Sequence, residues 1–163
     1  MVCIFTPMKS NLLSRPDLDA INSRGSDEMY ASHAYLYAAS CFQRRSLFGF
    51  QKWAEAEAAA ELTHRKKLQD FCNNMGSEIE MYSTKAIEFK DETVNGILTF
   101  LFNMEKTLLE AYENDYENAD RIASKNLFQE MVEIQVEGVG EIGDLMAEIE
   151  SVGIGFVNQR LLA

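Results

Sequence analysis

The chain has 163 residues, of which 47% are hydrophobic and 25% are charged, and this length and balance fit one soluble globular domain with a sizeable core. Its formal net charge of −11 argues against a nucleic-acid partner, because phosphate binding needs clustered Lys and Arg. The sequence has no run of about 18 apolar residues, so we expect no membrane span.

The first part of the chain predicts an irregular arm over residues 1–15, followed by a long helix. Ser14 is a suitable helix cap, Pro16 fits the first turn, and Asp17 carries the charge that this end of a helix favours. The helix is expected to end at about Gln43. Its inward stripe consists of Ile21, Glu28, Ala31, Tyr35 and Phe42.

A second helix is predicted from about Leu47 to Met75, in a segment rich in strong helix formers. Its inward stripe consists of Ala54, Glu57, Ala58, Glu61, His64, Leu68 and Phe71. The connection that precedes it is short, which makes the two helices antiparallel neighbours. Gly76 is expected to end this helix. Residues 76–91 show no helical stripe, so they are expected to cross over to the far end of a bundle.

Two further long helices are predicted, from about Glu92 to Glu117 and from about Arg121 to Glu150, and a short one over residues 155–162. The third stripe contains Leu98, Leu101, Glu105, Leu108 and Tyr112, and the fourth contains Phe128, Met131, Val132, Gln135, Gly138, Val139 and Ile142. The fold class is therefore all-α: a four-helix bundle with one long crossover between helices 2 and 3, short other connections and a short fifth helix. It fills a single domain, 1–163.

Polar side chains interrupt the apolar stripe of each long helix near its middle. They are Glu28, Glu61, His64, Glu105 and Gln135. Buried carboxylates are costly and repel one another, and a shared cation removes both costs. Carboxylates with one imidazole suit iron, manganese or zinc. The Glu61-x-x-His64 unit, with single Glu residues from other helices, is the pattern of di-iron sites inside bundles.

Each of these residues also has a simpler explanation. A Glu-x-x-His unit often occurs by chance, and a lone Glu on a stripe usually reaches solvent. Gln135 alone would be a satisfied core amide, and Tyr35 alone a core aromatic with its hydroxyl paired. The metal interpretation is favoured because four consecutive helices repeat the same interruption.

Four strings resemble the helix motifs of the ferritins, in order, over residues 14–162. They are DEMYASHAYLY with Glu28 and Tyr35, AELTHRKKLQDF with Glu61 and His64, FNMEKTLLEAY with Glu105, and MVEIQVEGVGEI with Gln135. The resemblance implies a ferritin-like bundle and an iron-storage subunit with a heavy-chain-type ferroxidase centre. Such a subunit oxidises Fe(II) with O2 or H2O2 and stores ferric mineral in a hollow shell.

The same resemblance implies two iron ions per subunit. One would bind Glu28, Glu61 and His64, and the other Glu61 and Glu105 with Gln135 nearby. Tyr35 would give an electron or hydrogen-bond a ligand. The short fifth helix supports a homo-oligomeric shell of twenty-four subunits, and no haem is expected. The alternative is a light-chain-like shell subunit that stores mineral with little oxidase activity, which the retained ligands argue against.

Several positions depart from the ferritin pattern. Gly138 stands where many bacterial ferritins have a carboxylate, whereas the animal heavy-chain type has a small residue there, so this chain resembles the heavy-chain type at its second iron position. Ala60 and Ile134 replace acids of a third iron site, so none is predicted. Lys125 and Phe128 replace typical acids of the three-fold pore, which leaves the iron entry route undefined.

Glu57 lies one turn before Glu61 and is either an accessory site or a solvated residue, and we favour the solvated one. The only histidines are His33 and His64, which disfavours bacterioferritins, ribonucleotide-reductase-like enzymes and DNA-protecting miniferritins. A helical interaction module without metal remains a rival. The odd set Cys3, Cys41 and Cys72, with no secretory signal, predicts reduced thiols and a cytoplasmic protein.

Overall fold

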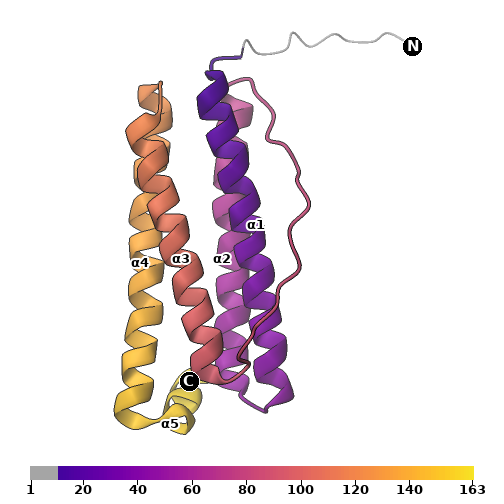
Figure 1. The fold of residues 1–163 in the computed structure, drawn as a ribbon, viewed down its shortest axis with the longest axis vertical. Helices are drawn as coiled ribbons and strands as arrows, with labels where there is room; N and C mark the ends of the chain where they lie inside the picture. The colour runs from indigo at the N-terminus through magenta and orange to yellow at the C-terminus, as the bar shows by residue number, and fades with distance from the viewer. Residues whose placement is uncertain (1–10) are drawn as a thin grey trace, which may run out of the picture.

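The computed structural model describes residues 11–163, and this part of the chain contains five α-helices. They are α1 (Arg15–Arg44), α2 (Phe48–Asn74), α3 (Val94–Asn118), α4 (Ile122–Val152) and α5 (Ile154–Arg160). The four long helices form a bundle, and α5 lies across one end of it against α2 and α4 (Figure 1). The predicted four-helix bundle with a short fifth helix is confirmed, and each boundary falls within a turn of its predicted position. Residues 1–10 of the predicted arm lie outside the described part.

The long connection between α2 and α3 runs beside α1 from one end of the bundle to the other, as predicted (Figure 1). It begins at Gly76, whose φ of 75° lies in the left-handed region that glycine adopts without steric cost. The N–H of Ser77 donates to the carbonyl of Cys72 at 2.9 Å, which closes the last turn of α2. Gly76 therefore ends α2 in the way the sequence indicates.

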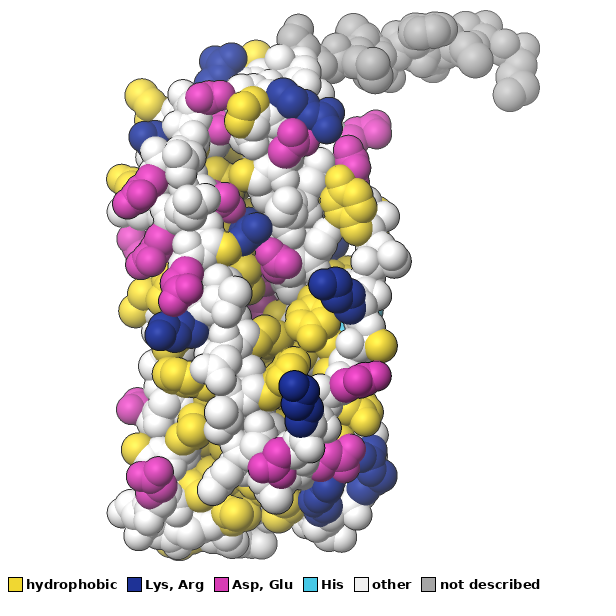
Figure 2. Space-filling model, in the orientation of Figure 1, with side chains coloured by type: hydrophobic (Ala, Val, Ile, Leu, Met, Phe, Trp, Pro, Cys, Tyr) yellow, Lys and Arg dark blue, Asp and Glu magenta, His cyan; other side chains and the backbone are white. Residues whose placement is uncertain are grey.

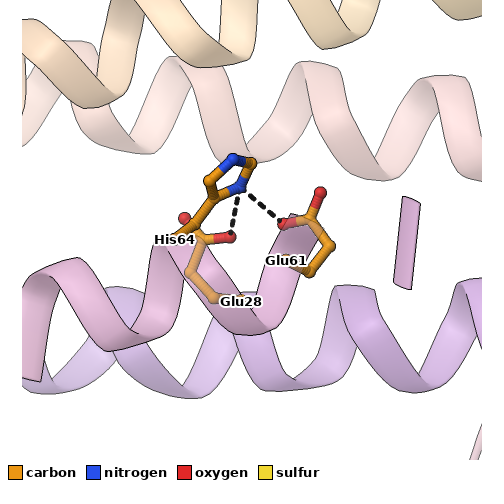
Figure 3. A group of neighbouring side chains, drawn as sticks. All are labelled: Glu28, Glu61 and His64. Carbon is orange, nitrogen blue, oxygen red and sulfur yellow. Dashed lines mark hydrogen bonds and ion pairs between the residues drawn. The ribbon is translucent and has the colours of Figure 1, made fainter. Parts of the chain in front are cut away.

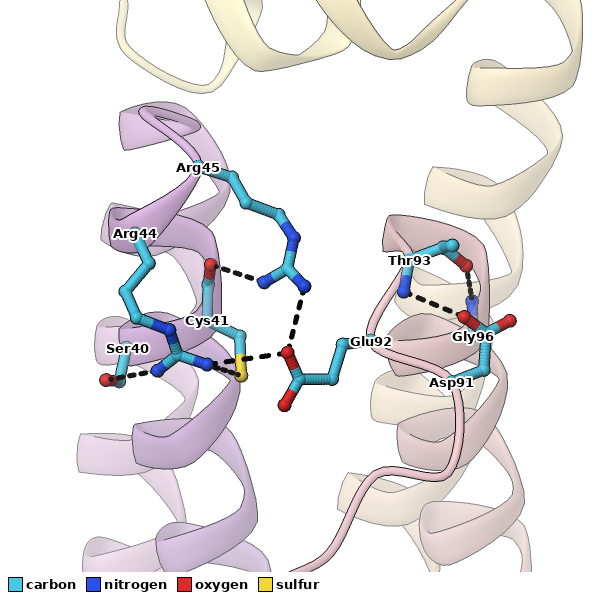
Figure 4. A network of polar contacts seen from close by, with 8 residues as sticks. All are labelled: Ser40, Cys41, Arg44, Arg45, Asp91, Glu92, Thr93 and Gly96. Carbon is cyan, nitrogen blue, oxygen red and sulfur yellow. Dashed lines mark hydrogen bonds and ion pairs between the residues drawn. The ribbon is translucent and has the colours of Figure 1, made fainter.

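The crossover ends in a network that ties the end of α1 to the start of α3 (Figure 4). Arg45 places Nη2 at 2.9 Å from Oε2 of Glu92, and its Nη1 donates to the carbonyl of Cys41. Thr93 caps α3, because its Oγ1 accepts from the N–H of Gly96 at 3.1 Å. A Cβ at Gly96 would lie 2.4 Å from Cγ of Asp91, so the turn needs glycine at this position.

Helices α2 and α4 begin without a capping side chain of their own, since their N-cap residues are Leu47 and Arg121. Another helix supplies each cap. Oδ1 of Asn158 on α5 accepts from the backbone N–H of Gly49 at 2.9 Å. Asp17 on α1 is buried and accepts from the N–H groups of residues 120 and 121 and from the hydroxyl of residue 124. These contacts fix the ends of α2 and α4 relative to the rest of the bundle.

We expect Asp17→Ala to lower the free energy of unfolding by about 2–3 kcal/mol, because it removes a buried carboxylate that accepts three hydrogen bonds at the start of α4. Asp19→Ala is the matched control, since Asp19 lies on the same helix but is exposed, and Arg15 is its ion-pair partner among residues 11–163. Urea unfolding followed by circular dichroism measures both variants. Equal stability of the two would contradict the role assigned to Asp17.

The apolar core of the bundle consists of two clusters separated along the helix axes. One includes Tyr35, Phe42, Phe50, Ala58, Leu101 and Ile142. The other includes Ile21, Leu68, Leu108, Tyr112, Phe128 and Met131. On every long helix, the buried polar residue of the stripe falls between members of the two clusters: Glu28, Glu61, Glu105 and Gln135. The fold therefore places a polar layer in the middle of an otherwise apolar bundle.

Between residues 11 and 163, no helix combines the length and the apolar character needed to cross a membrane. Cys41 and Cys72 are buried and free, while Cys3 lies outside the described residues.

Candidate metal centre

Three ligand-type side chains meet where α1 and α2 pack together. One atom each from Glu28, Glu61 and His64 forms a group in which all atoms lie within 4.8 Å of one another. Nδ1 of His64 lies 3.2 Å from Oε2 of Glu61 and 3.7 Å from Oε2 of Glu28, so the imidazole faces both carboxylates (Figure 3). Glu28 is fully buried and Glu61 is 4% exposed. The Glu-x-x-His unit thus faces the core, as its helical spacing predicts.

Glu105 and Gln135 complete the polar layer from the opposite pair of helices. Both are buried and line a small cavity of about 140 Å³ together with Glu61, His64 and Tyr35. The hydroxyl of Tyr35 donates to Oε1 of Glu105 at 2.8 Å. Glu105 does not belong to the compact group that Glu28, Glu61 and His64 form. The structure therefore brings all six predicted site residues into one region: Glu28, Glu61 and His64 lie close together, and Glu105, Gln135 and Tyr35 lie nearby on the cavity wall.

Two oxygens of this layer are buried without a hydrogen-bond partner among residues 11–163. They are Oε2 of Glu28 and Oε1 of Gln135. A buried oxygen left unpaired costs free energy unless it binds something. Both atoms are of the kind that binds a hard or borderline cation, and carboxylate, amide and imidazole donors together fit iron or a similar divalent ion.

The electrostatics of the layer favour bound positive charge. Burial raises the pKa of Glu61 to about 8. Burial, assisted by the neighbouring Glu61, likewise raises the pKa of Glu105 to about 8. Burial opposes a charged imidazole, yet the contacts with Glu28 and Glu61 outweigh it and raise the pKa of His64 to about 10. Without a cation, the layer therefore holds protons that a metal ion would replace.

Glu57 is half-buried and lines the same cavity. Its position therefore differs from the solvated one that the sequence analysis favours. Burial, followed by the charge of Glu141, raises its pKa to about 7. Glu137, Gly138 and Glu141 of α4 also line the cavity, and the two glutamates are exposed. No atom lies within 4 Å of a Cβ built at Gly138, so the missing side chain leaves space there. The cavity is therefore bordered by acids toward the outer surface of α2 and α4.

Tyr112 contacts the layer and was assigned only to the core by its position on the third stripe. Its hydroxyl donates to Oε1 of Glu28. The signal for this contact was present in the sequence, because Tyr112 follows Glu105 by the same seven positions that separate Tyr35 from Glu28. The spacing recurs, but only the packing shows that each tyrosine reaches the glutamate of the other helix.

A larger hollow lies elsewhere, on the face between α1 and α3. It measures about 630 Å³, and apolar side chains such as Phe100, Met104 and Leu108 line it. Figure 2 shows hydrophobic side chains along this furrow between the two helices. None of the six predicted site residues lines it, so the candidate centre is the smaller, polar cavity.

Comparisons with known proteins agree with this architecture. A family model described as a ferritin-like domain matches residues 18–152. A bacterial non-heme ferritin of Staphylococcus haemolyticus is 35% identical over 81 residues, which are 48% of this chain and 49% of that protein. A chloroplastic ferritin of Malus baccata var. xiaojinensis is 27% identical over 158 residues, with 88% of this chain and 63% of the relative covered. The chain thus spans about half the length of the bacterial relatives it matches.

Solved structures show the same fold. An open-pore ferritin from the archaeon Archaeoglobus fulgidus superposes with a TM-score of 0.86 at 23% identity, covering 91% of this chain and 95% of that one. A humanized archaeal ferritin gives a TM-score of 0.87 at 24% identity, covering 91% and 95%. The family model spans most of the chain, and the helix bundle, the long crossover and the polar layer agree with it. This chain therefore belongs to the ferritin family.

Proposed function

We propose that this chain is an iron-storage ferritin subunit that oxidises Fe(II) at a pair of metal positions inside its own bundle. The observation that carries the proposal is the convergence of Glu28, Glu61 and His64 within 4.8 Å in the core. Oε2 of Glu28 supports it, because this buried atom makes no hydrogen bond within residues 11–163 and faces the imidazole of His64, at 3.7 Å.

In this proposal, the first Fe(II) binds Glu28, Glu61 and His64. The second binds Glu61 and Glu105, with the Oε1 of Gln135 as a weak ligand or a partner of bound water. Glu61 is shared because it lies between the two groups and lines the cavity that Glu105 also lines. The second position has no imidazole and faces the open space at Gly138, so it binds its ion more weakly than the first.

The reaction is a transfer of two electrons. Each Fe(II) gives up one electron and becomes Fe(III), while O2 takes both with two protons and becomes H2O2. With H2O2 as the oxidant, the same two electrons and two protons give two molecules of water. The chain contributes by holding two ions side by side and leaving positions open for the oxidant.

Ferric product would leave through the acidic border formed by Glu57, Glu137 and Glu141 and collect as mineral inside a hollow homo-oligomeric shell. A shell of twenty-four subunits is supported by the fifth helix. On α5, Phe156 is 61% exposed, and at the chain's end Leu162 is 41% exposed, so apolar surface at this end of the bundle is left for a neighbouring copy.

A crystal soaked in Fe(II) without oxygen tests the assignment, because anomalous scattering locates the ions and the packing counts the subunits. We expect two iron peaks per subunit in the polar layer. Stopped-flow oxidation then separates this function from a light-chain-like shell subunit, which would store mineral without a fast phase. Iron peaks confined to the outer surface of the bundle would contradict the proposal.

A further inference from the structure

Helices α1 and α3 hold each other's glutamates through two tyrosines. Tyr35 on α1 donates to Glu105 on α3, and Tyr112 on α3 donates to Glu28 on α1. In both helices the tyrosine follows the glutamate by seven positions. Because seven residues are about two turns, each glutamate and the tyrosine that follows it share the inward face. The result is a reciprocal brace across the polar layer.

Both phenol groups are fixed by burial and by aromatic neighbours. Tyr35 is 1% exposed and Tyr112 is fully buried. The ring of Tyr35 meets Trp53 edge to face, with ring centres 5.8 Å apart. The ring of Tyr112 packs against Phe128, with ring centres 6.5 Å apart. Rings held in this way cannot swing away, so their hydroxyl groups act as fixed donors.

The contact with Tyr112 has a definite effect on Glu28. The phenol occupies Oε1 and leaves Oε2 as the free oxygen, and Oε2 is the atom that faces Nδ1 of His64. Oε2 has no hydrogen-bond partner in the described part of the chain. A fixed donor on one carboxylate oxygen sets the orientation of the group and directs the other oxygen to a metal ion. Tyr35 likewise donates to Oε1 of Glu105.

We propose that Tyr112 is a positioning residue that prepares Glu28 for the first metal ion, as the counterpart on α3 of the ligand contact that the ferritin resemblance implies for Tyr35 on α1. This inference rests on the proposed function, since it concerns the same two metal positions. Each tyrosine serves the position whose glutamate it holds, so the two act on different ions. A tyrosine that merely satisfied its own hydroxyl in the core would show no such preference for one position.

Cobalt(II) binding tests the inference without any oxidation reaction. We expect Tyr112→Phe to weaken the first position by about 10-fold or more and to leave the second nearly unchanged, because outer contacts of a ligand contribute about 10–100-fold in affinity. Tyr35→Phe should weaken the second position instead. Calorimetric titration gives the affinities, and anomalous occupancy in crystals soaked at limiting Co(II) tells which position has lost its ion.

Tyr30→Phe is the matched control, because Tyr30 lies on α1 and lines the outer hollow but not the polar cavity. Melting curves of the metal-free variants test whether the bundle still forms; phenylalanine keeps both rings in place. If Tyr112→Phe weakens both positions equally, or neither, the positioning role is wrong. If the unmodified protein itself binds no Co(II) pair in the layer, the proposed function fails instead, which is a different result.

Discussion

Replacing Glu61 by Ala should abolish the fast phase of Fe(II) oxidation, with a loss of rate of about 100-fold or more. Glu61 is the one acid that contacts His64 and also lines the cavity shared with Glu105, so its loss removes an oxygen ligand from both metal positions. Stopped-flow absorbance at two Fe(II) per subunit measures the effect. The slower growth of mineral on an existing core should persist, because it does not need the pair.

Glu55→Ala is the control for this variant. Glu55 lies on the same helix but is exposed, and its side chain accepts a hydrogen bond from Gln51, so its removal should leave the fast phase intact. The bundle of the Glu61→Ala variant should remain folded, because the variant loses a buried acid that is costly without metal. Rapid oxidation at the unmodified rate would overturn the ligand assignment. The rival of a helical module that does not use metal predicts something else, namely that the unmodified protein itself shows no fast phase and takes up no iron.

The metal-free protein should lose thermal stability as the pH rises from 5 to 8, with a fall in Tm of several degrees. Glu61 and Glu105 have an ordinary pKa of 4.5 and a pKa of about 8 in the bundle. Between these values, the folded chain keeps protons that the unfolded chain releases, so the free energy of unfolding decreases with pH. His64 acts in the same direction, because its pKa rises from 6.5 to about 10. Its favourable contribution is complete below 6.5 and is lost as the pH rises.

A divalent cation should reverse this trend. Bound metal replaces the protons and pairs with the carboxylates, so Tm at pH 8 should rise most when Co(II) or Zn(II) is added. Circular dichroism melts of chelator-treated protein, at constant ionic strength, measure both effects. Glu61→Gln should flatten the pH dependence, since an amide does not ionise. A metal-free Tm that stays level or increases toward pH 8 would show that the layer does not hold protons in this way.

Much of the fold follows from local sequence. The apolar stripes fix which face of each helix is buried, and Ile21, Leu68, Leu101 and Phe128 are buried as expected. Ser14 begins α1 and accepts from the N–H of Asp17, so this cap was readable from the sequence. These features are local, because a helix period, a cap or a terminating glycine depends on residues only a few positions apart.

The candidate ligands could also be predicted from the sequence, since four acids or amides on apolar stripes are costly unless something joins them. The contacts that Asp17 and Tyr112 make with other helices could not be predicted in this way. Asp17 was assigned to the start of its own helix, yet it caps α4 more than a hundred positions away. Tyr112 was counted as core, although its hydroxyl holds Glu28. A side chain's partner on another helix depends on how the helices are rotated and shifted against one another, which local patterns do not record.

The sequence by itself thus specified four amphipathic helices, their ends and the acids that interrupt their apolar faces. Tertiary packing alone fixed which atoms meet: the imidazole of His64 between two carboxylates, the half-buried position of Glu57, and the crossed pairs of tyrosine and glutamate. The physical reason is that the two kinds of feature depend on residues at different separations along the chain. Burial follows from a periodicity within one helix, whereas a hydrogen bond or a metal position needs the distance between helices to be right within a fraction of an ångström.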